Sequence, residues 1–105
     1  MPKDIDQKDF EDEVIKSKTA VLVDFWAEWC PPCRALSPLL VEVAEEVGDK
    51  AKLVKVNVDE NQELSMKFGI TSIPTTIMFK DGEVVETVIG LRPKQEYINL
   101  IEKHL

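Results

Sequence analysis

The chain has 105 residues, 44% of them hydrophobic and 31% charged, which suits one hydrophobic core and excludes intrinsic disorder. Two cysteines are too few for a scaffold held together by disulfides. The net charge of −7 repels phosphate backbones and anionic membranes, so we expect no nucleic-acid binding and no membrane association.

The N-terminus, MPKDIDQKDF, lacks the apolar region of a secretory signal, and no later stretch approaches the roughly 20 apolar residues of a membrane span. We therefore expect a cytoplasmic protein. No linker, repeat or low-complexity stretch interrupts the chain, so residues 1–105 are predicted to form a single domain.

The first half of the chain predicts a helix, a buried strand and a second helix. Residues 8–16 place Phe10 and Val14 on one side of a helix, whereas residues 20–27 (AVLVDFWA) are apolar on both faces except at Asp24. Residues 33–47 carry apolar side chains at spacings of three and four, and Gly48 follows as a helix end. Pro38 lies inside this helix and predicts a bend.

The second half predicts a strand at 53–59, a short helix at 61–68, a hairpin and a last helix. The hairpin joins residues 75–80 to 83–89 through Asp81-Gly82. The last helix begins near Pro93 and would bury Tyr97, Ile98, Ile101 and Leu105. Strands that alternate with helices indicate parallel pairing, and the hairpin adds antiparallel strands, so we expect a mixed sheet covered on both faces.

Cys30 and Cys33 lie between the buried strand and the long helix, where a C-x-x-C pair is typical of a redox motif. Cys30 at the helix N-terminus would face free backbone donors and the positive end of the helix dipole, which stabilise a thiolate. We therefore expect Cys30 to be the exposed nucleophile. Cys33, one turn further, is expected to be more buried and to resolve the intermediate.

The sequence argues against three other roles for the cysteine pair. A zinc or iron–sulfur site needs four ligands, but the chain has two cysteines and one histidine, His104, near the opposite end. Covalent haem attachment requires histidine directly after the second cysteine, where this chain has Arg34. A structural disulfide would close a very short loop in a reducing compartment. Reversible thiol chemistry is favoured, with no metal.

Asp24 is unusual because a carboxylate inside a buried strand needs a partner or carries a raised pKa. The residues alone favour a structural role for Asp24 over a catalytic one. Lys55 is either the partner of Asp24 on a neighbouring strand or a solvent-facing lysine. Pro74 precedes a strand, and the general preference of X-Pro bonds favours a trans peptide. His104 is assigned no function.

Several separated features resemble the thioredoxin family over nearly the whole chain. They are residues 24–30 (DFWAEWC), Pro38, Lys55 with Asp59, the sequence Ile73-Pro74-Thr75, and the glycines Gly82 and Gly90. The resemblance implies an α/β thioredoxin fold, with a five-stranded mixed β-sheet flanked by four α-helices. It also implies that the loop at Pro74 carries a cis proline.

The resemblance implies a thiol–disulfide oxidoreductase that reduces protein disulfides through a mixed disulfide. It assigns nucleophile and resolving roles to Cys30 and Cys33, proton transfer to Asp24, and tuning of Asp24 to Lys55. It also implies an apolar substrate groove made by Trp29, Pro31, Pro32, Val58, Ile73, Pro74, Ile89 and Gly90, in which the Ile73 backbone pairs with the substrate. The partners implied are disulfide-containing proteins and an NADPH-dependent thioredoxin reductase, with no bound cofactor.

The chain departs from the family at Pro31, where most thioredoxins have glycine. Pro31 removes a backbone N–H near the Cys30 sulfur, whereas Pro32 stiffens the turn. These two effects need not change the reduction potential of the cysteine pair in the same direction. Pro-Pro suggests a more oxidising thiol oxidase or isomerase as an alternative. A second alternative is a non-catalytic binding module for a partner enzyme.

Overall fold

The computed structural model describes residues 1–105 and contains one mixed five-stranded sheet with the strand order β1-β3-β2-β4-β5. The strands are β1 (Lys3–Asp4), β2 (Ala20–Trp26), β3 (Ala51–Asn57), β4 (Thr75–Lys80) and β5 (Glu83–Ile89). β3 runs parallel to β1 and β2, whereas β4 is antiparallel to both β2 and β5. The sheet is therefore parallel on one side of β2 and antiparallel on the other.

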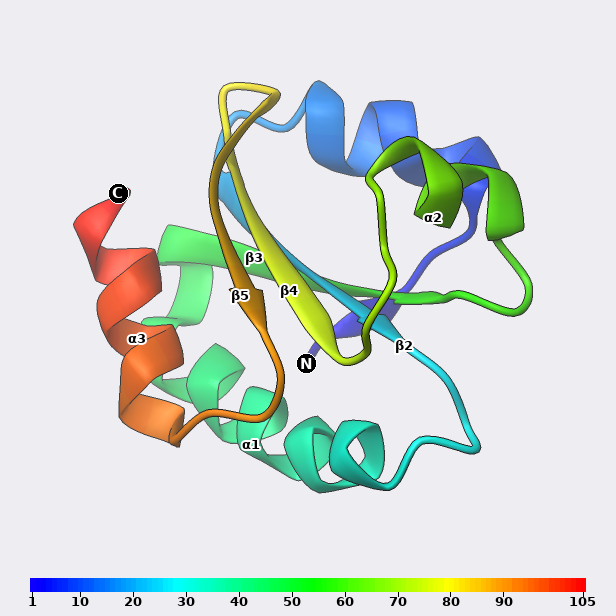
Figure 1. Cartoon of the computed structure of the whole chain (residues 1–105). Helices are drawn as coiled ribbons and strands as arrows, with labels where there is room; N and C mark the ends of the chain where they lie inside the picture. Colours follow the sequence, from blue (N-terminus) through cyan, green and yellow to red (C-terminus); the bar gives the residue numbers. More distant parts are fainter.

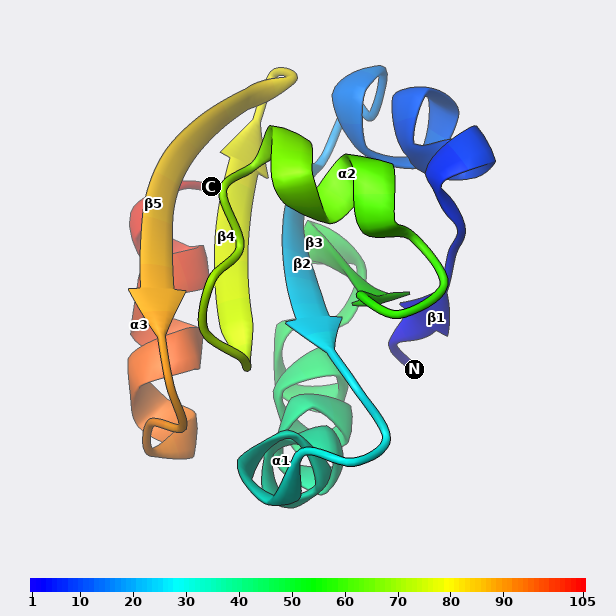
Figure 2. The same cartoon turned by 45° about the vertical axis from the view of Figure 1, so that its right-hand side comes forward.

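Helices cover both faces of the sheet, as Figures 1 and 2 show. One face carries α1 (Pro31–Val47) and α3 (Lys94–Lys103), and the other carries α2 (Gln62–Lys67) with two N-terminal helical segments, η1 (Gln7–Asp9) and η2 (Glu11–Ile15). This arrangement confirms the predicted five-stranded mixed sheet with four helices, in which η1 and η2 together form the first helical segment.

Each face of the sheet has its own apolar core because the side chains of a strand alternate between faces. Leu22 and Met78 pack with Leu36 of α1 and Ile101 of α3 on one face. Four phenylalanines gather on the other face, where the rings of Phe10, Phe25, Phe68 and Phe79 lie 5.4 to 6.2 Å apart in tilted or edge-on contacts. β2 contributes to both cores and is buried over six of its seven residues.

Some predicted boundaries and helix types were wrong. The N-terminal helix consists of a 3-10 turn and a π turn instead of an α-helix, and the Lys16 N–H donates to the Glu11 carbonyl at 2.9 Å. The wider π turn lets Phe10, Val14 and Ile15 pack on the same core cluster. β3 ends at Asn57 because the Asn57 side chain accepts the Asp59 N–H and turns the chain.

The last helix was also predicted too long. α3 ends at Lys103, and Leu105 is exposed instead of buried. The reason is that His104 lies at the helix end and its ring contacts Glu86 of β5 at 3.1 Å, which directs the chain away from the core. Tyr97, Ile98 and Ile101 are buried as predicted.

The predicted hairpin is confirmed by the pairing of β4 with β5. Its turn residues, Asp81 and Gly82, both have positive φ, at 53° and 79°. A Cβ atom at Gly82 would lie 2.7 Å from the Ile15 carbonyl oxygen, so the turn also needs glycine for space. None of the helices combines the length and the apolar composition that spanning a membrane requires.

Tyr97 ties α3 to the segment that follows β5. Its ring is fully buried, and its hydroxyl donates to the Gly90 carbonyl at 3.2 Å and accepts the Arg92 N–H at 3.1 Å. The Gly90 N–H in turn donates to the Pro74 carbonyl at 2.8 Å. One buried hydroxyl therefore holds the loop beside Pro74 in place.

Replacing Tyr97 with phenylalanine keeps the buried ring but leaves the Gly90 carbonyl and the Arg92 N–H without their partner. We expect Tyr97→Phe to lower the free energy of unfolding by about 1 to 2 kcal/mol. Urea denaturation followed by circular dichroism measures the change. Asn99→Ala, which alters an exposed position on the same helix, is the control and should change stability by less than about 0.5 kcal/mol; equal losses in both variants would contradict the role of the hydroxyl.

Candidate functional site

Cys30 and Cys33 form a disulfide at the beginning of α1, with their Cα atoms 5.2 Å apart. β2 ends at Trp26, a three-residue loop follows, and Cys30 is the N-cap of α1. Figure 2 shows this loop leaving β2 at one end of the sheet and turning directly into the helix. The pair thus lies between the most buried strand and a helix N-terminus, as the sequence predicted.

The Cys30 sulfur takes the place that a polar capping side chain usually fills. It accepts the Cys33 N–H at 3.2 Å, and it lies 3.7 Å from the Ile73 carbonyl oxygen. Pro31 and Pro32 occupy the first two positions of α1 and supply no N–H, so the Cys33 amide is the first donor of the helix. This donor and the helix dipole would both stabilise a thiolate on Cys30.

The predicted difference in exposure between the two cysteines was wrong. Cys30 is 3% exposed and Cys33 is 2% exposed, so both are buried. Cys30 is buried because its sulfur turns inward to cap the helix and packs in a small cluster with Ala27 and Cys33, against Val58 and Ile73. Position in the helix, and not residue exposure, distinguishes the two thiols.

The structure brings the predicted groove residues together from four parts of the chain. Val58 and Ile73 pack beside the disulfide, Gly90 is hydrogen-bonded to Pro74, and Ile89 pairs with Thr75. The side chains that remain at the surface around these are Trp29, Pro31, Pro32 and Ile89. Apolar side chains therefore surround the disulfide at the surface.

The Ile73–Pro74 peptide bond is cis. The general preference for trans bonds was thus the wrong guide here, and the cis-proline loop implied by the family resemblance was right. The physical setting is a loop held on both sides: the Thr75 hydroxyl donates to the Ser72 carbonyl at 2.5 Å, and the Pro74 carbonyl accepts from Gly90.

Two hydrogen bonds beside the disulfide were not predicted from the sequence. The Trp29 indole N–H donates to the Asp59 carboxylate at 2.7 Å, and the Arg34 guanidinium donates to the Glu28 carbonyl at 2.8 Å. Both hold the loop between β2 and α1. A signal for the first contact existed, because Trp29 and Asp59 each follow a strand of a parallel pair, and the ends of such strands meet at one edge.

Asp24 is 1% exposed, and neither of its carboxyl oxygens has a hydrogen-bond partner. Burial raises its pKa from 3.8 to about 7, while Lys55 lowers it and Asp4 raises it further. Asp24 lies two residues beyond Leu22 on the face covered by α1, toward the end of β2 where α1 begins. It is therefore a buried acid on the face that α1 covers, able to hold or release a proton near neutral pH.

Lys55 is paired in register with Asp24 across β2 and β3, but its amino group has another partner. The Nζ atom donates to the Ser37 hydroxyl at 2.9 Å and lies 4.4 Å from the centre of the Trp26 ring. No ion pair joins Lys55 to a carboxylate. Sequence reasoning missed Ser37, although it follows Cys33 by one helical turn and so faces the same side of α1.

Other candidate groups lie outside this site. His104 is paired with Glu86 at the far end of α3. The structure contains no cluster of three or more histidine, cysteine, aspartate or glutamate side chains placed to hold a metal ion.

Because burial raises the Asp24 pKa, the folded protein keeps a proton that the unfolded chain loses near pH 4. The contribution of Asp24 to the free energy of unfolding is therefore most favourable below pH 4, and it decreases gradually as the pH rises to about 7. We expect Asp24→Asn to raise the free energy of unfolding at pH 8 by up to about 4 kcal/mol and to change it little at pH 3. Urea denaturation at both pH values measures this, and an equal effect at pH 3 and pH 8 would contradict the titration of Asp24.

Comparisons with known proteins agree with this geometry. The sequence profile of the Thioredoxin family matches residues 2–103. The chain is 54% identical over 89 residues to a thioredoxin of Bacillus subtilis, covering 85% of this chain and 86% of the relative. It is 51% identical to a thioredoxin of Listeria monocytogenes and 47% identical to one of Rickettsia bellii, each over 105 residues and the full length of both chains.

The shared family and the disulfide at the start of α1 support thiol–disulfide exchange and favour neither a separate oxidase or isomerase nor a binding module. The chain belongs to the thioredoxin family and is a thiol–disulfide oxidoreductase with a disulfide-forming cysteine pair.

Proposed function

We propose that this protein reduces disulfides in other proteins, passing two electrons from the Cys30–Cys33 dithiol to the substrate. The observation that carries this proposal is the place of the Cys30 sulfur, which caps α1, accepts the Cys33 N–H and lies beside the Ile73 carbonyl. The Cys33 N–H and the helix N-terminus would stabilise the thiolate of the reduced protein, and the Ile73 carbonyl beside it is a backbone group that can bind a partner.

The reaction begins with the Cys30 thiolate attacking one sulfur of the substrate disulfide. A bond forms between Cys30 and that sulfur, the substrate disulfide breaks, and its second sulfur leaves as a thiolate that takes a proton. Cys33 then loses its proton and attacks the Cys30 sulfur. The mixed disulfide breaks, the first substrate sulfur leaves as a thiolate that takes a proton, and Cys30 and Cys33 end as a disulfide.

Asp24 is the proposed acceptor of the Cys33 proton. A base works best when its pKa is near the working pH, and burial raises the Asp24 pKa to about 7. Lys55, held by Ser37 on α1, provides the positive charge that offsets the ionised form of Asp24. Asp24 thus acts on Cys33, whereas the helix N-terminus acts on Cys30.

The substrate is proposed to bind along the apolar surface around the disulfide. An extended substrate segment would pair with the Ile73 backbone as an added strand. The apolar contacts would come from Trp29, Pro31, Pro32, Val58, Ile73, Pro74, Ile89 and Gly90.

The electrons are proposed to come from an NADPH-dependent thioredoxin reductase. We place the protein in the cytoplasm, with residues 1–105 acting as a single domain. The chain has no G-x-G-x-x-G motif, so the nucleotide would bind to the reductase.

The cysteine roles lead to different trapping by single variants. We expect Cys33→Ser to accumulate a mixed disulfide with a disulfide-bonded protein such as insulin, because the resolving thiol is missing. Cys30→Ser lacks the nucleophile and should trap little. Non-reducing gels and mass spectrometry measure the adducts, with the double cysteine variant as the background. Equal trapping through both cysteines would contradict the assignment.

Turnover tests the reductase function itself. With NADPH, a bacterial thioredoxin reductase and insulin, we expect NADPH oxidation that depends on this protein. Cys30→Ser should abolish this oxidation, and Asp24→Asn should slow it severalfold above pH 7 because the base is missing. Absorbance at 340 nm follows the reaction. If NADPH is not consumed while chemical reductants still reduce the Cys30–Cys33 disulfide, the proposed electron source is wrong.

A further inference from the structure

A row of three charged residues crosses the parallel half of the sheet. Asp4 of β1 is in register with Lys55 of β3, and Lys55 is in register with Asp24 of β2. Side chains in register on parallel strands point to the same face, so all three lie on the face that α1 covers. The row runs from the sheet edge, where Asp4 is exposed, to the buried Asp24.

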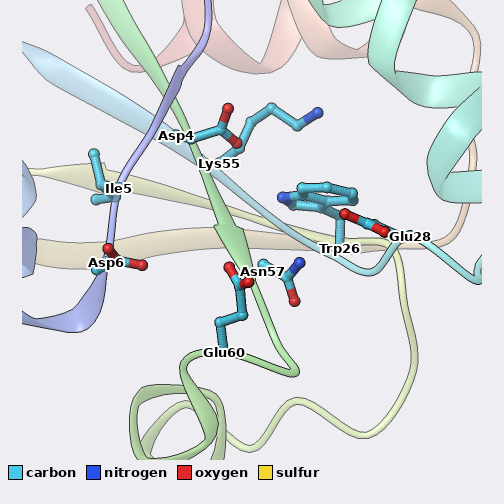
Figure 3. A pocket seen from close by; sticks show the side chains of 8 residues that line it. All are labelled: Asp4, Ile5, Asp6, Trp26, Glu28, Lys55, Asn57 and Glu60. Carbon is cyan, nitrogen blue, oxygen red and sulfur yellow. The ribbon is translucent and has the colours of Figure 1, made fainter.

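Asp4 has no partner of its own. Its carboxylate takes part in no hydrogen bond and no ion pair, whereas the adjacent Lys3 is paired with Glu13. Asp4 and Lys55 both line a pocket of about 350 Å³ next to Trp26. Figure 3 shows the Asp4 carboxylate beside the start of the Lys55 side chain, with the amino group pointing away from it. The charge of Asp4 is therefore not cancelled by direct contact.

The effect of the Asp4 charge on the ionisation of Asp24 depends on the other groups around Asp24. Lys55 is the one cation in the row, and α1, which covers this face, contributes the neutral Ser37 hydroxyl that binds the Lys55 amino group. β4 places the neutral Thr76 opposite Asp24. From α3 comes Tyr97, whose phenol is neutral at pH 7 because burial raises its pKa above 10.0. Lys55 and Asp4 are thus the charged groups that affect the Asp24 pKa: Lys55 lowers it and Asp4 raises it.

We propose that Asp4 is a positioning residue for proton transfer, whose carboxylate at the sheet edge opposes the Lys55 ammonium in the row that ends at Asp24. The relevance to catalysis rests on the proposed function, in which Asp24 receives the Cys33 proton. The electrostatic effect itself does not depend on that function. Burial has the largest effect on the Asp24 pKa, and the charge of Asp4 lowers further the fraction of Asp24 that is ionised and available as a base at a given pH.

Three other acidic residues line the same pocket and provide a matched control. Asp6, Glu28 and Glu60 contribute carboxylates to it but lie outside the row of paired residues. Glu60 is exposed, and its side chain makes no hydrogen bond or ion pair. Glu60→Gln therefore removes one negative charge from the pocket without touching the row.

The test is a carbon-13 NMR titration of the Asp24 carboxyl in the oxidised full-length protein. We expect Asp4→Asn to move the Asp24 midpoint to lower pH by about 0.5 pH units, because a negative charge near Asp24 is removed. Asp4→Glu should restore the wild-type midpoint, and Glu60→Gln should move it by less than half as much. Amide spectra of each variant verify that the fold is kept.

Two results would overturn the proposal: an Asp24 midpoint unchanged in Asp4→Asn, or equal movement in Asp4→Asn and Glu60→Gln. The second would mean that the pocket's total charge, and not the row, acts on Asp24. The kinetic consequence is measured separately as the pH profile of insulin reduction, whose lower limb should follow the Asp24 midpoint in Asp4→Asn. If the midpoint moves but the profile does not, the proposed role of Asp24 fails while the electrostatic role of Asp4 stands.

Discussion

Burial of β2 on both faces is the constraint on which the rest of the structure depends. The strand supplies side chains to both apolar cores, so helices must cover the sheet on each side. The chain leaves β2 at one end of the sheet and returns over one face as α1, which places the helix N-terminus beside the strand end. This path locates Cys30 and Cys33 at the helix start and leaves Asp24 buried on the face that α1 covers.

The two halves of the site obtain their chemistry from different physical sources. Cys30 is the N-cap of a helix whose first two residues are prolines. The backbone N–H of Cys33 is therefore the first amide of the helix that can donate a hydrogen bond to the Cys30 sulfur. Asp24 has no hydrogen-bond donor, and its pKa reflects burial opposed by Lys55. A helix end thus favours a negative charge on one group, while an apolar interior disfavours it on the other. In the reduced protein that opposition would favour a thiolate on Cys30 and a proton on the Asp24 carboxyl at the same pH.

The surface around the disulfide depends on contacts between distant segments. A backbone hydrogen bond from Gly90 to Pro74 holds Ile73 and Pro74 next to Gly90. The Tyr97 hydroxyl in turn hydrogen-bonds to the Gly90 carbonyl and the Arg92 N–H. Trp29 is fastened to Asp59 on the other side. The apolar surface around the disulfide is therefore assembled from loops, each fixed by one or two hydrogen bonds to a neighbouring element.

Much of the fold and the cysteine pair could be predicted because the signals are local. The apolar run of β2, the three-and-four spacing of α1, the Asp81-Gly82 turn and the C-x-x-C motif each depend on a few neighbouring residues. Errors arose where tertiary packing overrides local preference. The π turn at Glu11–Ile15 follows core packing, and the end of α3 follows the contact between His104 and Glu86.

The sequence by itself determined the order of the elements, the position of two thiols at a helix start, and the presence of one carboxylate in a buried strand. Only the tertiary structure decided that the Cys30 sulfur turns inward, that Lys55 binds Ser37 instead of Asp24, and that Asp4 joins their row. The physical reason is register. Which side chains face one another across strands depends on how the whole sheet pairs, and the separations involved, such as 51 residues between Asp4 and Lys55, lie beyond any local pattern.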